Sequence, residues 1–334
     1  MPLSARRGAA CFALLAAYLA TALGLAGCAK KRPHPAPRTA LPYWIQAEKY
    51  PAIGPERPLG ARQLAVRWYG TAAFEVRTAR GTVFFDPNFT RDPLGALLFG
   101  AARAKPERWR FAYAQPTAIF IGHAHFDHFL DAPEFAKRTG ATLYASDEAL
   151  RVARSEGVPE RQLSAVRGGQ RVAVGDMVVE VLPGRHSEMV TQLLAGGSMP
   201  AAVKAPLWFL DYKNGPTYTF LVRWRGRTLA HIDSADFDDA AFSGHKADVA
   251  LFAISGWTYT KDVFARLYED LGPDVFVPMH HDDFFAPLSE PVVEGPLARL
   301  KEAYAAIGRD MPGTAILPND QFFGEFRLGP LESP

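Results

Sequence analysis

The sequence predicts an α/β fold in which two β-sheets pack face to face with helices on their outer sides. Short apolar segments separated by glycine-containing turns recur from residue 61 onward, as expected of β-strands. Residues 117–121 form an uninterrupted apolar run, which is typical of a strand buried on both faces. The strand segments form two sets, each followed by helical segments, and this order favours two layered sheets. The pattern by itself is compatible with other α/β layouts.

Each predicted element has its own local signal. In chain order, the predicted strands cover residues 64–69, 73–77, 82–85, 117–121, 177–182, 218–224, 227–232, 248–254 and 275–278. Ser146 is expected to cap a helix that ends at Gly157. Thr260 is expected to cap a second helix, which Gly272 ends. The apolar face of that helix has helical spacing, with Val263, Phe264, Leu267 and Leu271.

The N-terminus has the pattern of an export signal. Arg6 and Arg7 precede a charge-free stretch rich in alanine and leucine, which closes with small residues and Cys28. This ending resembles the lipobox of bacterial lipoproteins, in which cleavage precedes the cysteine and the cysteine sulfur is acylated. An uncleaved anchor helix is the alternative, because the charge-free stretch is long enough to cross a bilayer. The expected division of the chain is a signal peptide over residues 1–27, an acylated Cys28 with a proline-rich tether over residues 28–60, and a folded domain over residues 61–330.

The segment that follows the signal predicts both a tether and a membrane location. Residues 30–60 contain seven prolines and no sustained periodicity, so they are expected to be extended and to become more ordered near Trp44. His34 in this segment is expected to be solvated. By resemblance to known lipoproteins, Ala29 after the cysteine favours the outer membrane, facing the periplasm, over the inner membrane or the cell surface.

Charge and cysteine content restrict the function. The chain has 37 basic and 35 acidic residues, and the numbers become equal once Arg6 and Arg7 are set aside with the signal. A neutral body does not favour a broad nucleic-acid-binding face. The two cysteines, Cys11 and Cys28, both precede the body. A metal site in the body must therefore use histidine and carboxylate ligands.

The segment that indicates chemistry directly follows the buried strand. His123, His125, Asp127 and His128 lie within six residues. The carboxyl end of a strand is where α/β proteins place their sites, and imidazole with carboxylate is a ligand set that suits zinc. Three further candidates follow later strands, namely His186, Asp233 and His280.

The HxHxDH segment and the order of the later candidates resemble the metallo-β-lactamase superfamily. This resemblance implies a four-layer αβ/βα sandwich and two bound metal ions, expected to be Zn²⁺, with Mn²⁺ or Fe²⁺ as alternatives. It also implies a metal-bridging hydroxide as nucleophile. In the implied ligand sets, His123, His125 and His186 hold one metal, Asp127, His128 and His280 hold the other, and Asp233 bridges.

The resemblance also suggests catalytic roles beside the ligands. Asp127 is expected to orient the hydroxide or accept its proton. His281 is expected to act as an acid or a substrate contact, or else to be a supporting or surface histidine. His231 and His245 are expected to be structural or on the surface.

Within the superfamily, the chain resembles the branch that contains L-ascorbate-6-phosphate lactonase and the N-acyl-phosphatidylethanolamine-hydrolysing phospholipase D. The resembling segments are residues 68–76, 84–89 and 278–280. Thr71 stands where those relatives carry histidine, and Ile232 stands where they carry glycine before the bridging aspartate. These departures put the inherited substrate in doubt.

The expected function is hydrolysis of a phosphodiester or an ester or lactone, on a small-molecule or lipid substrate. A non-enzymatic metal-binding envelope lipoprotein that retains the fold is the alternative. A β-lactamase is less favoured, because zinc β-lactamases with three histidines at one metal commonly carry cysteine where Asp233 stands. A di-iron redox protein is disfavoured too, because such relatives carry a carboxylate where His125 stands.

Three further segments carry predictions about the pocket and the surface. Residues 187–217 are rich in large apolar side chains and form either a lid over the substrate or a helix and loop packed on the core. Residues 87–116, with Trp109 and Phe111, are a second candidate for the pocket wall. Asp236, Asp238 and Asp239 are expected on a solvated turn.

Overall fold

The computed structural model describes residues 31–48, 58–109, 115–188 and 192–331. The signal peptide, Cys11 and Cys28 lie outside the described residues, as does Phe111. None of the helices within the described ranges has the length and hydrophobicity that a bilayer crossing requires.

The first sheet has eight strands in the order β1-β15-β2-β3-β4-β5-β6-β7. Their bounds are β1 Ile45–Glu48, β2 Leu64–Trp68, β3 Phe74–Thr78, β4 Gly81–Phe85, β5 Ala118–Phe120, β6 Thr142–Ala145, β7 Leu163–Ala165 and β15 Glu325–Leu328. The four strands from β4 to β7 run parallel, and the remaining neighbours pair antiparallel.

The second sheet has seven strands in the order β14-β13-β12-β11-β10-β9-β8. Their bounds are β8 Arg171–Val174, β9 Met177–Pro183, β10 Tyr218–Trp224, β11 Arg227–Ile232, β12 Val249–Ala253, β13 Val275–Met279 and β14 Ala315–Ile316. The strands β11 to β14 are parallel, whereas β8, β9, β10 and β11 form antiparallel neighbours.

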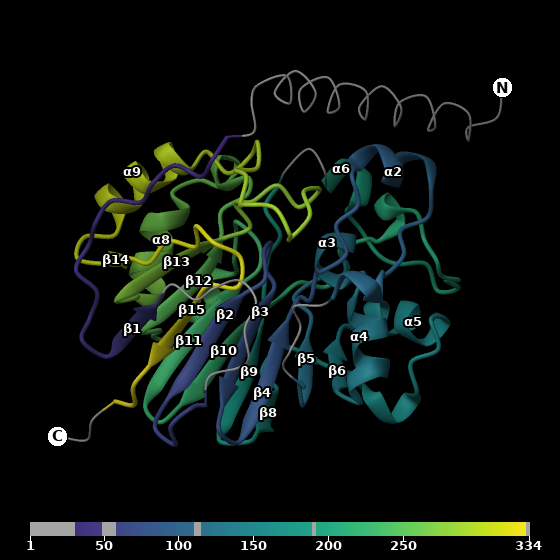
Figure 1. Cartoon of the computed structure of the whole chain (residues 1–334), viewed down its shortest axis with the longest axis horizontal. Helices are drawn as coiled ribbons and strands as arrows, with labels where there is room; N and C mark the ends of the chain where they lie inside the picture. The colour runs from purple at the N-terminus through teal and green to yellow at the C-terminus, as the bar shows by residue number, and fades with distance from the viewer. Residues whose placement is uncertain (1–30, 49–57, 110–114, 189–191, 332–334) are drawn as a thin grey trace.

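Helices cover the outer sides of both sheets (Figure 1). The α-helices are α2 Leu94–Phe99, α3 Phe126–Phe129, α4 Ala132–Thr139, α5 Asp147–Ser155, α6 Gln192–Ala195, α7 Asp239–Phe242, α8 Val263–Leu271 and α9 Leu300–Asp310. The 3₁₀ helices are η1 Pro106–Arg108, η2 Glu160–Gln162, η3 Phe209–Asp211 and η4 Trp257–Tyr259. Helices α4 and α5 lie beside β6 and β7, and α8 and α9 lie beside the second sheet (Figure 1).

Alternation along single strands shows how the layers share the core. On β12, Val249, Leu251 and Ala253 belong to the apolar core between the sheets. Ala250 and Phe252 point the other way, into a second core beneath α8 and α9. Both faces of this strand are buried, which explains why its sequence reads as a continuous apolar run. The predicted α/β sandwich with two face-to-face sheets is confirmed.

Most predicted elements are present, with one wrong cap. Ser146 caps α5, because its side chain accepts a hydrogen bond from the backbone N–H of Ala149, and Gly272 ends α8 in a left-handed conformation. Thr260, however, does not cap α8. The residue before this helix is Asp262, which has a φ of 49° and makes no capping side-chain hydrogen bond. The helix is therefore held by its buried face rather than by a cap.

The structured chain begins before the predicted domain boundary. Within the range assigned to the tether, β1 pairs with β15 at the edge of the first sheet. The guanidinium of Arg227 lies over the Trp44 ring, with its Cζ 4.0 Å from the ring centroid. Thr39 exchanges hydrogen bonds with the backbone of Ile316, the last residue of β14. The segment 31–48 therefore lies along the body, because its partners come from strands far away in the chain.

Candidate metal centre

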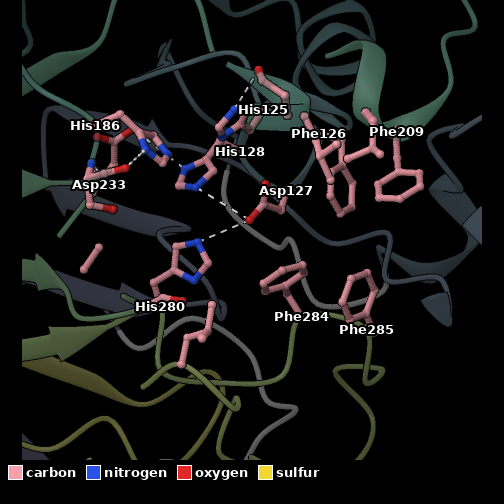
Figure 2. Close-up of a pocket in the computed structure, with 18 of the residues that line it drawn as sticks. His125, Phe126, Asp127, His128, His186, Phe209, Asp233, His280, Phe284 and Phe285 are labelled. Carbon is pink, nitrogen blue, oxygen red and sulfur yellow. Dashed lines mark hydrogen bonds and ion pairs between the residues drawn. The ribbon is translucent and has the colours of Figure 1, made fainter. Parts of the chain in front are cut away.

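The candidate ligands come together at one end of the two sheets. His123, His125, Asp127 and His128 follow β5, and α3 begins inside this segment. His186 follows β9, Asp233 follows β11 and His280 follows β13. Figure 2 shows His125, His128, His186, Asp127, Asp233 and His280 facing a common centre.

The ligand atoms form three groups, within each of which all atoms lie within 4.8 Å of one another. The groups are His123 with His125 and His186, Asp127 with His128 and His280, and His123 with His128 and Asp233. The first two groups contain the same residues as the two ligand sets that the resemblance implies. The third group joins one histidine of each set to Asp233.

Asp233 lies between the two histidine sets. Its Oδ2 is 2.6 Å from His123 Nδ1 and 3.8 Å from His128 Nδ1. The close packing of its carboxylate requires glycine at position 122, where an added Cβ would lie 2.0 Å from the same oxygen. The lack of a side chain at Gly122 therefore leaves room for the Asp233 carboxylate beside His123.

Burial keeps the histidines in the form that binds metal. The pKa of His123 and that of His128 are lowered, chiefly by burial and then by neighbouring imidazoles. Burial and His186 lower the pKa of His125 to about 4. Neutral imidazole is the form that coordinates metal, so no proton has to leave these rings at neutral pH.

The Asp127 carboxylate stays charged in this setting. Burial acts to raise its pKa, but His128 and His280 outweigh burial, and the pKa is lowered. Its Oδ2 lies 3.2 Å from His280 Nε2. The other ring nitrogen of His280, Nδ1, is buried and has no hydrogen-bond partner. An orphaned imidazole nitrogen in a cluster of carboxylates and imidazoles fits a metal site.

Asp86 is a member of the site that the sequence analysis missed. It is fully buried after β4, where it accepts a hydrogen bond of 2.8 Å from the backbone N–H of Gly122. Its Oδ2 lies 3.2 Å from His128 Nδ1, so it orients this ring. Burial, followed by the charge of Asp233, raises the pKa of Asp86. Two signals could have found it: an aspartate directly after a buried strand, and its position in the resembling segment 84–89.

The backbone at His280 is held by a second group of buried residues. His280 has a φ of 55°, and its N–H donates to the carbonyl of Thr71, which has a φ of 48°. The Thr71 N–H donates to Asp282 Oδ1. Asp282 Oδ2 lies 2.7 Å from Arg91 Nη1, and both side chains are buried. Sequence reasoning missed Arg91 and Asp282, because nothing local in the chain pairs residues this far apart.

The expected catalytic role of His281 is wrong. Its ring is 1% exposed, stacks on Trp68 at 5.0 Å between centroids, and places Nε2 2.8 Å from the carbonyl oxygen of Asn319. The preceding residue, His280, lines the pocket, whereas His281 does not. His281 is thus a supporting histidine. His231 is structural, as expected: it is buried, stacks on Phe85 and contacts the carbonyl of Ala72.

The predicted solvated turn after Asp233 is wrong in part. Asp236 is 7% exposed, accepts a hydrogen bond from the Phe237 N–H and lies 3.2 Å from Arg266 Nη1. Asp239 also pairs with Arg266. Only Asp238 has no such partner among the described ion pairs, and it caps α7.

The pocket beside the ligands has an apolar side. Phe126, Phe209, Phe284 and Phe285 line it together with the ligand side chains (Figure 2). Leu194, Ala195, Phe209 and Leu210 come from the segment 187–217, so part of that segment forms the wall. Trp109 does not line the pocket but packs in the core against Phe89 and Phe135. Among the described residues of the segment 87–116, Leu94 lines the pocket.

The fold and this cluster together define the class: a protein of the metallo-β-lactamase fold with a histidine- and aspartate-rich candidate metal centre. The chain belongs to the family described as Beta-lactamase superfamily domain, which matches residues 82–281. This range contains every candidate ligand.

Relatives with similar sequences carry one shared name. The chain is 30% identical over 226 residues to a UPF0173 metal-dependent hydrolase of Pyrobaculum arsenaticum, a match that covers 66% of this chain and 85% of the relative. It is 28% identical over 278 residues to the UPF0173 metal-dependent hydrolase of Myxococcus xanthus, covering 81% of this chain and 86% of the relative.

Solved structures support the fold. Igni18, a metallo hydrolase from Ignicoccus hospitalis, matches with a TM-score of 0.52 at 18% identity, covering 81% of this chain and all of that chain. The metallo-β-lactamase fold protein YhfI from Bacillus subtilis matches with a TM-score of 0.51 at 11% identity, covering 80% of this chain and 99% of that chain.

Proposed function

We propose that this protein is a dinuclear zinc hydrolase that cleaves a phosphodiester or an ester or lactone bond. Its family and the relatives named above indicate that the chain is a metal-dependent hydrolase of the metallo-β-lactamase superfamily. Our proposal adds the number of metal ions, their identity and the bond that is cleaved.

The position of Asp233 is the observation that carries the proposal. One carboxylate oxygen lies near a histidine of each ligand set, at 2.6 and 3.8 Å. No lysine or arginine within the described ranges forms an ion pair with Asp233. A buried carboxylate costs free energy unless a positive charge accompanies it. Two dications, one in each ligand set, supply that charge.

The candidate ligands would form two metal sites, and Asp127 would also act on the attacking water. His123, His125 and His186 would hold one ion, and Asp127, His128 and His280 the other. Two such ions lower the pKa of a bound water and polarise the substrate oxygen. The Asp127 carboxylate lines the pocket and is charged at neutral pH, so its Oδ atoms can accept a hydrogen bond from the attacking water and orient it, whereas its lowered pKa makes it a weak acceptor of the proton.

Zinc is the proposed metal because the donor set is dominated by imidazole. Five histidines and two carboxylates face the centre, and the only cysteines of the chain precede the body. Imidazole ligands favour zinc over magnesium or calcium, which prefer all-oxygen sites. Mn²⁺ and Fe²⁺ are the alternatives that the same donors accept.

We also propose that Cys28 is acylated after removal of residues 1–27, which would place the domain on the outer membrane, facing the periplasm. The lipobox-like ending of the charge-free stretch supports this proposal. Replacing Cys28 by serine should move the protein from the membrane fraction to the soluble fraction. Unchanged membrane association would indicate an uncleaved anchor helix instead.

The test of the proposed function combines metal analysis with a substrate panel. The purified protein should contain about two zinc equivalents and cleave at least one of bis-p-nitrophenyl phosphate, p-nitrophenyl butyrate and a simple lactone. His125→Ala should lose metal and activity together. His34→Ala is the matched control, because His34 is exposed and far along the chain from the ligands. Full metal without hydrolysis of any panel member would favour the non-enzymatic alternative.

A further inference from the structure

The pocket beside the ligands is lined on one side by a continuous cluster of aromatic rings. Phe126 packs against Phe209 at 5.4 Å and against Phe284 at 6.0 Å between ring centroids. Phe284 contacts Phe285 at 4.5 Å and His280 at 5.5 Å. The rings therefore extend from a candidate metal ligand outward along the pocket, as Figure 2 shows.

Three separate segments supply these rings. Phe126 lies in the ligand segment itself, Phe209 lies in η3, and the last two follow His280. Among the described residues that line the pocket, none is lysine or arginine. A phosphorylated sugar or another multiply charged arm would find no cationic side chain here, whereas an uncharged apolar arm would be desolvated against phenylalanine.

The start of the described chain lies beside the same wall. The Lys31 carbonyl accepts a hydrogen bond from the N–H of Glu294, and Glu294 forms a β-bridge with Asp282, two residues before Phe284. Figure 1 shows this start of the chain along the upper side of the molecule, where α6 and α9 also lie. Cys28 is three residues before Lys31, and three residues span at most about 11 Å. An acyl group on Cys28 would therefore hold the aromatic wall close to the bilayer.

A further apolar group is exposed near the pocket. Helix α2 begins at Leu94, which lines the pocket, and ends at Phe99, which is 94% exposed. The Phe99 ring is therefore a side chain that could contact lipid beside the pocket.

We infer that the substrate is an amphiphile drawn from the bilayer, whose uncharged apolar arm lies along Phe126, Phe209 and Phe285 while the bond to be cleaved lies at the histidine and aspartate cluster. This inference rests on the proposed function and adds the class of substrate to it.

A binding experiment tests the apolar arm without any need for turnover. Acetohydroxamate and octanohydroxamate share a metal-binding head and differ in the length of the apolar arm. The zinc-loaded protein should bind octanohydroxamate at least tenfold more tightly, because each buried methylene favours binding. Phe285→Ser and Phe209→Ser should each reduce that ratio at least threefold at unchanged metal content. Phe99→Ser, outside the pocket, should leave the ratio as it is.

The outcomes separate the inference from the proposed function. Equal binding of the two hydroxamates by a metal-loaded protein would overturn the apolar arm while leaving the hydrolase intact. A ratio that Phe285→Ser and Phe209→Ser do not change would overturn it as well. A protein that holds no metal and binds neither probe would overturn the proposed function, and the inference with it.

A second arm of the experiment distinguishes the bilayer from solution as the source. The full-length acylated protein and its Cys28→Ser variant are compared on vesicles of phosphatidylethanolamine and phosphatidylglycerol that contain p-nitrophenyl palmitate. The acylated protein should cleave this ester at least tenfold faster, and Phe99→Ser should slow it, whereas p-nitrophenyl butyrate in solution should be cleaved equally by all three proteins. Equal rates on the vesicles would show that the substrate comes from solution and overturn the bilayer as its source.

Discussion

Asp233 and Asp282 are both buried carboxylates near the candidate ligand His280, but the chain balances their charges differently. Asp282 lies 2.7 Å from the guanidinium of Arg91 and accepts a hydrogen bond from the Thr71 N–H. The ion-pair partners of Asp233 within the described ranges are His123 and His128, whose rings burial keeps neutral. Asp282 therefore has a permanently charged partner, Arg91, whereas Asp233 has no such partner within the described ranges.

The pKa values show the same contrast. Burial raises the pKa of Asp233, and the neighbouring histidines offset only part of this effect. Burial acts in the same direction on Asp282, but Arg91 outweighs it and the pKa is lowered. Asp282 already has its arginine and is structural, whereas Asp233 lacks a permanent cation and lines the pocket, so Asp233 is available to a metal ion.

The largest effect is expected from Asp233→Asn, which removes the negative charge but keeps the size. Metal content should fall below two equivalents, and turnover should fall by roughly a hundredfold or more. Metal analysis and initial rates on one substrate at saturating zinc measure both. Asp238→Asn is the matched control, because Asp238 caps α7 and asparagine caps equally well. Full metal and full rate in Asp233→Asn would assign the bridging position to another residue.

Asp282→Asn should chiefly lower the free energy of unfolding. It leaves the Arg91 charge buried without its partner, and loss of one member of a buried pair costs about 3–5 kcal/mol. Urea unfolding of the metal-free protein measures the free energy of unfolding. In the same assay Asp233→Asn should be neutral or stabilising, because it removes a buried charge that has no cation. Equal destabilisation by the two variants would contradict the comparison.

A double variant sharpens the assignment of Asp282. Arg91→Met combined with Asp282→Asn removes both charges, so the cost of the unpaired guanidinium disappears. We expect the double variant to regain about 2 kcal/mol relative to Asp282→Asn alone. Purely additive losses in the double-mutant cycle would show that the ion pair does not account for the stability of this region.

Asp131 offers a smaller test of a buried carboxylate without arginine. It accepts hydrogen bonds from the Phe89 and Thr90 N–H groups and from the Thr90 hydroxyl. Burial raises its pKa to about 6, against about 3.9 in the unfolded chain. An acid with a raised pKa favours folding below the unfolded value, and this contribution is lost as the pH rises through 6.

The Asp131→Asn variant should remove this dependence. The difference in unfolding free energy between wild type and variant should change by on the order of 2 kcal/mol between pH 4 and pH 7, in the direction that disfavours the wild type at the higher pH. Urea unfolding of the two metal-free proteins across this range measures it. A difference that stays constant with pH would show that Asp131 keeps an ordinary pKa.

The sequence by itself determined the elements whose signals are local. Strands buried on both faces, such as β12, read as apolar runs because every side chain along them meets a core. Four candidate ligands within six residues after β5 are visible without any tertiary contact. The order of His186, Asp233 and His280 after later strands was visible too, through the resemblance to the superfamily.

The tertiary structure alone decided which polar residues support those ligands. Asp86 orients His128, and Arg91 reaches Asp282 from a loop nearly two hundred residues earlier in the chain. His281 is adjacent to His280 in sequence, yet its ring stacks on Trp68 and does not line the pocket. Position 260 has the residue type of a cap, but α8 begins three residues later, at Val263. Local pattern specifies residue type and period, whereas partners across the fold depend on how the sheets bring distant segments together.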